Sequence, residues 1–392
     1  MKVGSMFYLN ASRVCRSAAA GIIMIVYPYL MLKGLHVSVV FLGLIYTAAA
    51  LATALLGVAL GYATDLWGRK ESLILGSILL PISSALLLFG INVPLTVAAA
   101  LLGGISSTGS MAGGGVGGAV APVQSSIIAD LTKREERTVY ISLLSFIGNL
   151  AASAGFVIGG FMTVEEALYG ATVLGILSVL LVLPMDLPKI RASSFKLKHG
   201  GVVGKFSITG LLNGLSQGLV TPFLIPFFIV AYDLSRSQMG IYGTIGSLLA
   251  TFTLLVAPRL ERWLGFLGTV YVTRGATVLM MGVFPFVRVL WGSLLIYVLY
   301  PSLRVVSIPV TQSAMMGMVD ADERGRINGL NQSSRLGFSA LGTAVATPFF
   351  DGSLLYLPFL AYSVTMAFNV YLYRKFFRVG AGVKSREAHV QE

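Results

Sequence analysis

Residues 61–70, Gly61-Tyr-Ala-Thr-Asp65-Leu-Trp-Gly68-Arg69-Lys70, separate two long apolar stretches of the chain. A short polar segment between two apolar runs of this length predicts a loop between transmembrane helices. Gly61 is expected to let a neighbouring backbone approach closely, and Gly68 to permit a turn that a Cβ would obstruct. Arg69 and Lys70 are expected to hold the loop in the cytoplasm, while the Asp65 carboxylate accepts hydrogen bonds or meets a partner helix N-terminus.

The composition indicates a protein dissolved in a bilayer. Of its 392 residues, 56% are hydrophobic and only 11% are charged, whereas about a quarter of a soluble domain is charged. The net charge of +12 comes from Lys and Arg in loops, and no basic patch interleaved with stacking aromatics is present. The sequence therefore predicts an integral membrane protein and gives no support to nucleic acid as a partner.

Membrane crossing by a helix takes about 20 apolar residues. Twelve windows qualify: 14–34, 38–63, 72–91, 95–128, 138–162, 166–185, 206–231, 238–258, 267–288, 291–317, 327–349 and 353–374. The fourth window is too long for one straight helix, and its glycine runs at 103–104 and 113–118 predict a break, a bend or a very close helix contact. The basic loops alternate with loops poor in Lys and Arg, which places both termini in the cytoplasm.

The pattern Gly-x-x-x-Asp-x-x-Gly-Arg-Lys at residues 61–70 resembles the signature loop between helices 2 and 3 of the major facilitator superfamily. An ordinary charged turn is the alternative interpretation. The resemblance covers nearly the whole chain, and it is closest to the drug-exporter-like prokaryotic members. It implies an all-α integral membrane protein with 12 transmembrane helices in two pseudo-symmetric six-helix bundles, the fold of that superfamily, which rock about a central substrate site.

Two related halves are visible in the sequence. Residues 122–125, Pro-Val-Gln-Ser, have a counterpart at 309–313, Pro-Val-Thr-Gln-Ser, and 61–70 has a degraded copy at 257–265. The polar segment 186–205 is expected to be a cytoplasmic linker, although a small surface helix would fit it as well. We expect an N-terminal bundle at 1–185, a C-terminal bundle at 206–376 and a cytoplasmic tail at 377–392.

Charged side chains within the membrane are costly and mark functional sites. None of the 16 carboxylates falls at the middle of a window, which argues against proton coupling by a membrane-buried Asp or Glu. The deep charges are cationic: Arg304 is 16 residues before Asp320, about 24 Å along a helix, and Arg335 is 11 residues after Arg324, about 16 Å. Arg304 is expected to bind an anionic or strongly polar group, or else to be a structural arginine tied to backbone carbonyls.

In the family that this chain resembles, the first, fourth, seventh and tenth helices line the central cavity. Polar residues there are our candidates for substrate binding, with hydrogen bonding between helices as the alternative. Asn213 and Gln217 are four residues apart and so share one helix face. The full set is Tyr27, Gln124, Asn213, Gln217, Tyr297, Tyr300, Arg304 and Gln312.

The resemblance also implies a cytoplasmic gate in which Asp65 faces residues 325–328 at the start of the eleventh helix and Arg69 reaches toward Asp130. A static clamp is the alternative. The gate set is Gly61, Asp65, Gly68, Arg69, Lys70, Asp130, Arg137 and Arg324.

In the fifth window, Gly155-Phe-Val-Ile-Gly159-Gly160 resembles a motif of the family's drug and proton antiporters. Phe156 stands where those proteins have proline, so the antiporter assignment does not carry over, whereas close helix packing at Gly155, Gly159 and Gly160 is expected.

The sequence predicts secondary active transport of a small organic molecule, with export of amphipathic organic compounds as the first expectation and organic-anion transport or exchange at Arg304 as the alternative. A membrane-embedded enzyme would need a clustered catalytic set and a sensor an extra domain, and neither is evident. The single Cys15, three scattered histidines and the lack of a nucleotide-binding loop give no metal site, no catalytic residue and no cofactor. We expect a multi-pass monomer in the cell membrane, with the substrate, a coupling ion and bilayer lipid as partners.

Overall fold

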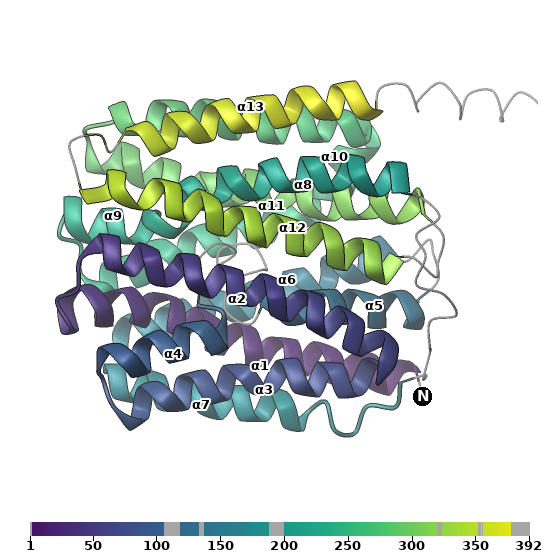
Figure 1. The fold of residues 1–392 in the computed structure, drawn as a ribbon, viewed down its shortest axis with the longest axis horizontal. Coiled ribbons are helices and arrows are strands. Elements are labelled where there is room, and N and C mark those ends of the chain that lie inside the picture. The colour runs from purple at the N-terminus through teal and green to yellow at the C-terminus, as the bar shows by residue number, and fades with distance from the viewer. Residues whose placement is uncertain are drawn as a thin grey trace, which may run out of the picture.

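The computed structural model describes residues 2–105, 118–132, 137–187, 200–319, 324–351, 354 and 356–377, where every regular element is a helix (Figure 1). The first half contains α1 (Lys2–Tyr29), η1 (Leu30–Gly34), α2 (Val39–Leu66), α3 (Arg69–Phe89), α4 (Val93–Gly103), η2 (Gly118–Val120), α5 (Ala121–Leu131), α6 (Arg137–Phe161) and α7 (Val164–Leu180). The second half contains α8 (Gly200–Val220), η3 (Thr221–Phe223), α9 (Leu224–Ala231), α10 (Arg236–Val283), η4 (Phe284–Phe286), α11 (Leu290–Gly317), α12 (Arg324–Ala346), η5 (Thr347–Asp351) and α13 (Leu357–Phe377).

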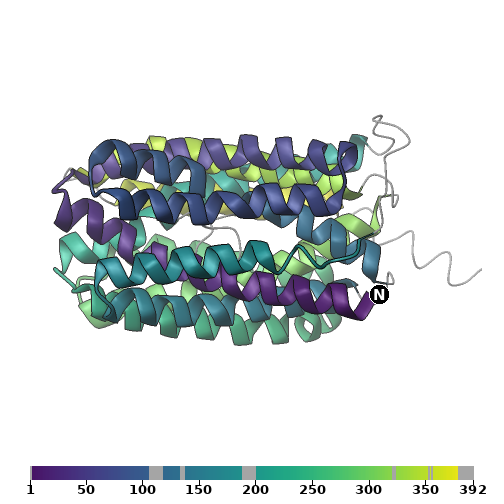
Figure 2. The ribbon, with the colours of Figure 1, turned by 90° about the horizontal axis from the view of Figure 1, so that it is seen from below.

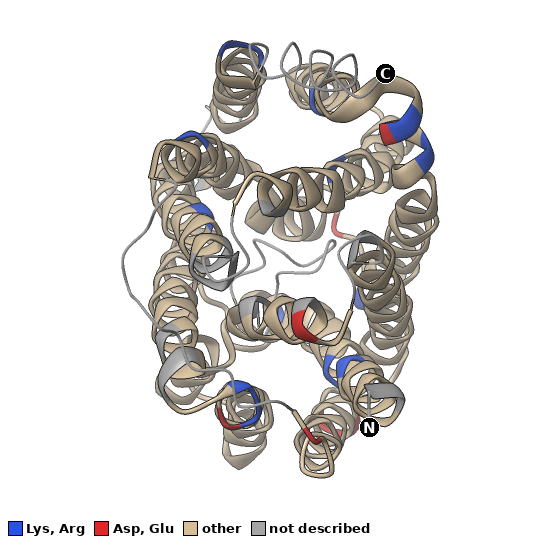
Figure 3. Ribbon diagram, turned by 90° about the vertical axis from the view of Figure 1, so that its right-hand side faces the viewer, with Lys and Arg blue, Asp and Glu red and all other residues tan. Residues whose placement is uncertain are grey.

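The helices run along the long axis of the molecule, as two perpendicular views show (Figures 1 and 2). We call the end that carries the start of α1 and the end of α13 the terminal face, and the opposite end, with Lys33 and Asp233, the far face. Figure 3 looks at the terminal face, where helices of both halves end.

Seven helical stretches of the described chain are long and apolar enough to cross a membrane. In this count α10 appears once. Its 48 residues would extend about 72 Å as one straight helix, about twice the thickness of a bilayer, which is enough for two passes. Gly265 interrupts α10 with φ 68° and ψ 175°, a conformation that glycine adopts without strain. The second pass of α10, the α4–α5 pair, α7, α12 and α13 complete the twelve helices predicted from the sequence.

The fourth pass is broken, as its glycines led us to expect. The helix α4 ends at Gly103, its C-cap Gly104 has a left-handed φ of 63°, and α5 begins only at Ala121. The glycine run at 113–117 lies outside the described residues.

Glycines let helices of the same half pack backbone against backbone. A Cβ on Gly155 would overlap the carbonyl oxygen of Ala18 in α1, and one on Gly159 would lie 2.8 Å from the carbonyl oxygen of Ile22. In the second half, a Cβ on Gly218 of α8 would overlap a carbonyl oxygen of α12. The pairs α1–α6 and α8–α12 therefore repeat one packing arrangement in the two bundles.

Among the described residues, the buried apolar clusters join the two halves only toward the far face. Near the far face, one cluster contains Tyr27, Met31 and Leu42 from the first half together with Phe228 and Phe359 from the second. Toward the terminal face, the described clusters each belong to a single half: one includes Leu9, Leu73 and Ile127, and another includes Phe206, Met315 and Tyr373. The apolar core thus seals the far face across both bundles.

The structure corrects two expectations. The first helix begins at Lys2 rather than at residue 14, because Arg13 and Arg16, which lowered the hydropathy of this stretch, find partners inside the bundle. Gly61 was expected to receive a close backbone, but a Cβ there would meet no atom within 4 Å. Among the described residues, no helix packs against that side of the last turns of α2.

Candidate functional site

Two arginines of the second half converge on the side chain of Gln217. The Gln217 Oε1 atom accepts hydrogen bonds from Arg304 Nη2 at 2.9 Å and from Arg335 Nη1 at 3.3 Å. Gln217 Nε2 in turn donates to Asn213 Oδ1 at 2.9 Å, as expected for residues four apart on α8. Arg335 also donates to Gln332 Oε1 at 2.9 Å, so both of its hydrogen-bond partners are neutral amides.

This polar cluster lies deep in the second bundle. Gln217 is 2% exposed and Arg304 is 6% exposed. Arg304 lies 13 residues before Gly317 at the end of α11, and therefore about 20 Å of helix from the terminal face. Side chains this deep do not reach bulk water by extending, so their hydrogen bonds must come from the protein or from a bound molecule.

Aromatic side chains lie farther along the same helix α11, toward the far face. Tyr297 and Tyr300 are both buried, and the Tyr300 hydroxyl lies 3.4 Å from Thr221 Oγ1. The rings of Tyr300 and Tyr362 meet edge to face at 5.9 Å, and Phe228 packs on Tyr297 at 5.2 Å. A wall of buried aromatic rings thus follows the arginine cluster along α11.

The first half contains a similar cluster that the sequence interpretation missed. Arg13 Nη1 and Arg16 Nη2 donate to the same atom, Gln124 Oε1, at 3.1 Å and 3.0 Å. Gln124 was a candidate, but Arg13 lies just before the predicted window 14–34 and Arg16 just inside it, and neither was singled out. Two arginines three residues apart next to a membrane-length apolar run were the signal that could have identified them.

The other candidates lie apart from these clusters. Tyr27 is buried and donates to the carbonyl oxygen of Thr96 at 3.1 Å, and Gln312 is half-buried on α11. Another buried arginine, Arg274 on α10, was also missed. Its guanidinium group donates to Asn369 Oδ1 and lies 4.6 Å above the ring of Tyr373. In the described part of the chain, no three His, Cys, Asp or Glu residues gather as metal ligands would.

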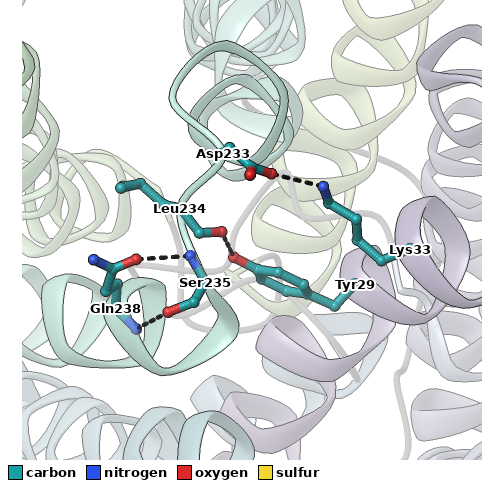
Figure 4. Close-up of polar contacts among 6 residues, drawn as sticks. All are labelled: Tyr29, Lys33, Asp233, Leu234, Ser235 and Gln238. Atoms are coloured by element: carbon teal, nitrogen blue, oxygen red, sulfur yellow. Dashed lines mark hydrogen bonds and ion pairs between the residues drawn. The ribbon is translucent and has the colours of Figure 1, made fainter.

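Polar contacts join the two halves at the far face (Figure 4). Lys33, at the end of the first pass, forms an ion pair with Asp233 at 2.7 Å, and the Tyr29 hydroxyl donates to the carbonyl oxygen of Leu234. The Lys33 ammonium lowers the pKa of the exposed Asp233 carboxyl by hydrogen bonding and by its charge. Arg236 adds a hydrogen bond to the carbonyl oxygen of Met162. Sequence reasoning had treated these loops only as short and poor in positive charge.

At the terminal face, Arg69 Nε lies 2.9 Å from Asp130 Oδ2, with the two side chains 11% and 16% exposed. This is the contact that the resemblance implied, and it joins α3 to α5 within the first half. Gly68 has φ 120° at the turn before α3, where a side chain would be strained, and Lys70 is half-buried beside it. The side chain of Asp65 lies outside the described part.

The structure likewise describes only the backbone, and not the side chains, of Arg137 in α6 and of residues 324–326 and 328 in α12. The implied contact of Asp65 with 325–328 therefore stays a prediction.

Comparisons with known proteins agree with this arrangement. The model of the Major Facilitator Superfamily matches residues 9–343. The Quinolone resistance protein NorA of Staphylococcus aureus is 23% identical over 362 residues, which cover 88% of this chain and 90% of NorA.

Two solved transporters share the fold. The human organic anion transporter MFSD10 (TETRAN) has a TM-score of 0.76 at 17% identity, covering 95% of this chain and 99% of its own. A D-xylose-proton symporter has a TM-score of 0.72 at 16% identity, covering 96% and 97%. With its twelve helices and this family match, the chain belongs to the major facilitator superfamily and is a multi-pass membrane protein that works as a secondary transporter of a small molecule, not as an enzyme.

Proposed function

We propose that this transporter exports small amphipathic organic anions and that Arg304 and Arg335 hold the acidic group of the substrate. The observation that carries the proposal is that both guanidinium groups donate to the single amide oxygen of Gln217. An amide oxygen is neutral, so these hydrogen bonds do not cancel the positive charge of Arg335, whose other acceptor, Gln332 Oε1, is also neutral. A carboxylate beside them would do so through charge-assisted and bidentate hydrogen bonds.

The aromatic wall supports an amphipathic substrate. Tyr297, Tyr300 and Tyr362 are fully buried next to the arginine cluster along α11, and such rings favour the apolar body of an organic molecule. The fold shared with an organic anion transporter fits this class of substrate. The similarity to a quinolone resistance protein supports export, because a membrane transporter can confer resistance by removing the compound from the cell.

The orientation is part of the proposal. Arg69 and Lys70 at the start of α3 and Arg374 and Lys375 in the last turn of α13 lie toward the terminal face, where Figure 3 shows the Lys and Arg of the helices in blue. We therefore place this face and both termini in the cytoplasm. The apolar seal at the far face then makes this the inward-facing state. We further propose a monomer in the cell membrane, bundles at 1–185 and 206–376, and 186–205 as the linker between them. The helix α8 already begins at Gly200 within that linker.

The test is transport by purified protein in liposomes, with organic carboxylates and their neutral amide analogues as matched substrates. Arg335→Gln and Arg304→Gln should reduce carboxylate transport more than tenfold. Arg288→Gln removes the same charge from an exposed position and serves as the control. Carboxylate transport that both cluster variants retain at the control level would refute the assignment.

A second candidate is export of uncharged or cationic amphipathic compounds, which the similarity to NorA over 88% of the chain favours. The same assay separates the two. Under this alternative the amide analogues are transported at least as well as the acids, and loss of either arginine leaves that transport unchanged.

A further inference from the structure

The cluster of Arg13 and Arg16 around Gln124 in the first half has no role in the transport proposed at Arg304 and Arg335. We propose that Arg13, Arg16 and Gln124 form a second anion-binding subsite, which receives a carboxylate group before it reaches the cluster around Gln217. The proposal takes its ligand class from the proposed function, but it rests on separate residues of the other bundle.

Two positively charged groups meet at one neutral oxygen in this cluster. The 3.1 Å and 3.0 Å hydrogen bonds from Arg13 and Arg16 bring both guanidinium groups to Gln124 Oε1. Arg16 and Gln124 are each 3% exposed, and the Nε atom of Arg13 is buried with no hydrogen-bond partner in the described chain. A buried donor without an acceptor is costly, and an oxyanion would supply an acceptor for Arg13 Nε.

The same chemistry is built differently in the two bundles. In the first half the arginines lie on α1 and the glutamine on α5, whereas in the second half the glutamine lies on α8 and the arginines on α11 and α12. By the sequence repeat, the counterpart of Gln124 is Gln312. However, Arg304 and Arg335 donate to Gln217 and not to Gln312. An arginine pair on a glutamine is therefore not merely a remnant of duplication, and this points to a shared requirement for binding anions.

The position of the subsite indicates the order of binding. Gln124 lies seven residues before Leu131 at the end of α5, about 10 Å of helix from the terminal face. Gln217 lies 17 residues after Gly200 at the start of α8, about 25 Å from that face. An anion that enters from the terminal face, where the described apolar clusters of the halves are separate, meets Arg13 and Arg16 first.

The experiment measures how many benzoate ions the full chain binds in lipid nanodiscs, by equilibrium dialysis and by the rise of the unfolding temperature with benzoate. The wild type should bind two. Gln124→Glu places a carboxylate between Arg13 and Arg16, so this variant should bind one and should unfold at a higher temperature than the wild type without benzoate. Asn92→Asp makes the same amide-to-acid change at an exposed helix N-cap and should still bind two.

The outcomes separate the two claims. Gln217→Glu should also reduce binding to one, and the double variant Gln124→Glu/Gln217→Glu to none. Two ions bound to Gln124→Glu, or only one bound to the wild type, would overturn the second subsite. If Gln124→Glu loses an ion while Gln217→Glu keeps both, the proposed function is wrong and the subsite stands. Should Gln124→Glu not fold, Arg13→Gln/Arg16→Gln tests the same loss, and inorganic phosphate in place of benzoate tells whether the subsite needs an organic body.

Discussion

Replacing Gln217 by glutamate tests the charge of the central cluster most sharply. The new carboxylate would accept the hydrogen bonds that Gln217 Oε1 now receives at 2.9 Å and 3.3 Å. A hydrogen bond to a charged acceptor contributes about 1 kcal/mol more than one to a neutral acceptor, so two of them should stabilise the fold by about 2 kcal/mol. The bond that Gln217 donates to Asn213 is lost, but the Asn213 amide can turn and donate instead.

The same substitution should abolish anion binding at the central cluster. A fixed negative charge about 5 Å from a bound carboxylate repels it by about 3 kcal/mol at an effective dielectric constant of about 20, which weakens binding more than hundredfold. Gln217→Leu should also impair transport, but it removes an acceptor from two buried guanidinium groups and should lower the unfolding temperature. Thermal unfolding and carboxylate uptake into liposomes are the two measurements. Uptake by Gln217→Glu within threefold of the wild type, or a lower unfolding temperature, would refute the reasoning.

Three further predictions concern the contacts that hold the helices in place. Asp233→Asn removes the ion pair with Lys33 and should raise the chemical labelling of the far-face loops from outside. Lys33 lowers the pKa of Asp233 below its ordinary value of 3.8, so the wild-type ion pair should persist at neutral pH and be lost only as the pH falls through the lowered pKa. Labelling of the wild type at a series of pH values checks this. Gly155→Ala should cost about 1–3 kcal/mol of stability because its Cβ overlaps a carbonyl of α1, whereas Gly170→Ala, with its nearest neighbour at 3.9 Å, should change the unfolding temperature little. Asp130→Asn removes the negative charge that pairs with the largely buried Arg69 and should lower the stability of the fold by about 1–3 kcal/mol. A double-mutant cycle with Arg69→Gln that shows no coupling energy between the two positions would contradict this.

The sequence predicted the helices well because bilayer thickness fixes their length. The turn at Gly68 and the break in the fourth pass follow from patterns of ten to thirty residues. The ion pair of Arg69 with Asp130 was implied by the family resemblance. These features are local or belong to one family motif, so the chain itself carries the information.

What the sequence did not predict depends on contacts between distant helices. Arg13 lies in an apolar helix because Gln124, 111 residues away, receives it. Lys33 and Asp233 are ordinary loop residues until the two halves place them 2.7 Å apart. Gly61 fits the motif, yet no described atom lies within 4 Å of a Cβ placed there, because its neighbours depend on how the helices pack and not on the motif.

The central claim is that the two bundles, sealed together at the far face, rock about the arginine clusters. The most direct measurement is spin-label distances in a Cys15→Ser background, with labels at Trp67 and Trp263, exposed on the terminal face in different halves, and a second pair at His36 and Ala231 on the far face. When the transported anion is added, the account predicts that the far-face distances lengthen in a fraction of the molecules while the terminal-face distances shorten in the same fraction. Distances that change with the same sign at both faces, or do not change while transport proceeds, would contradict it.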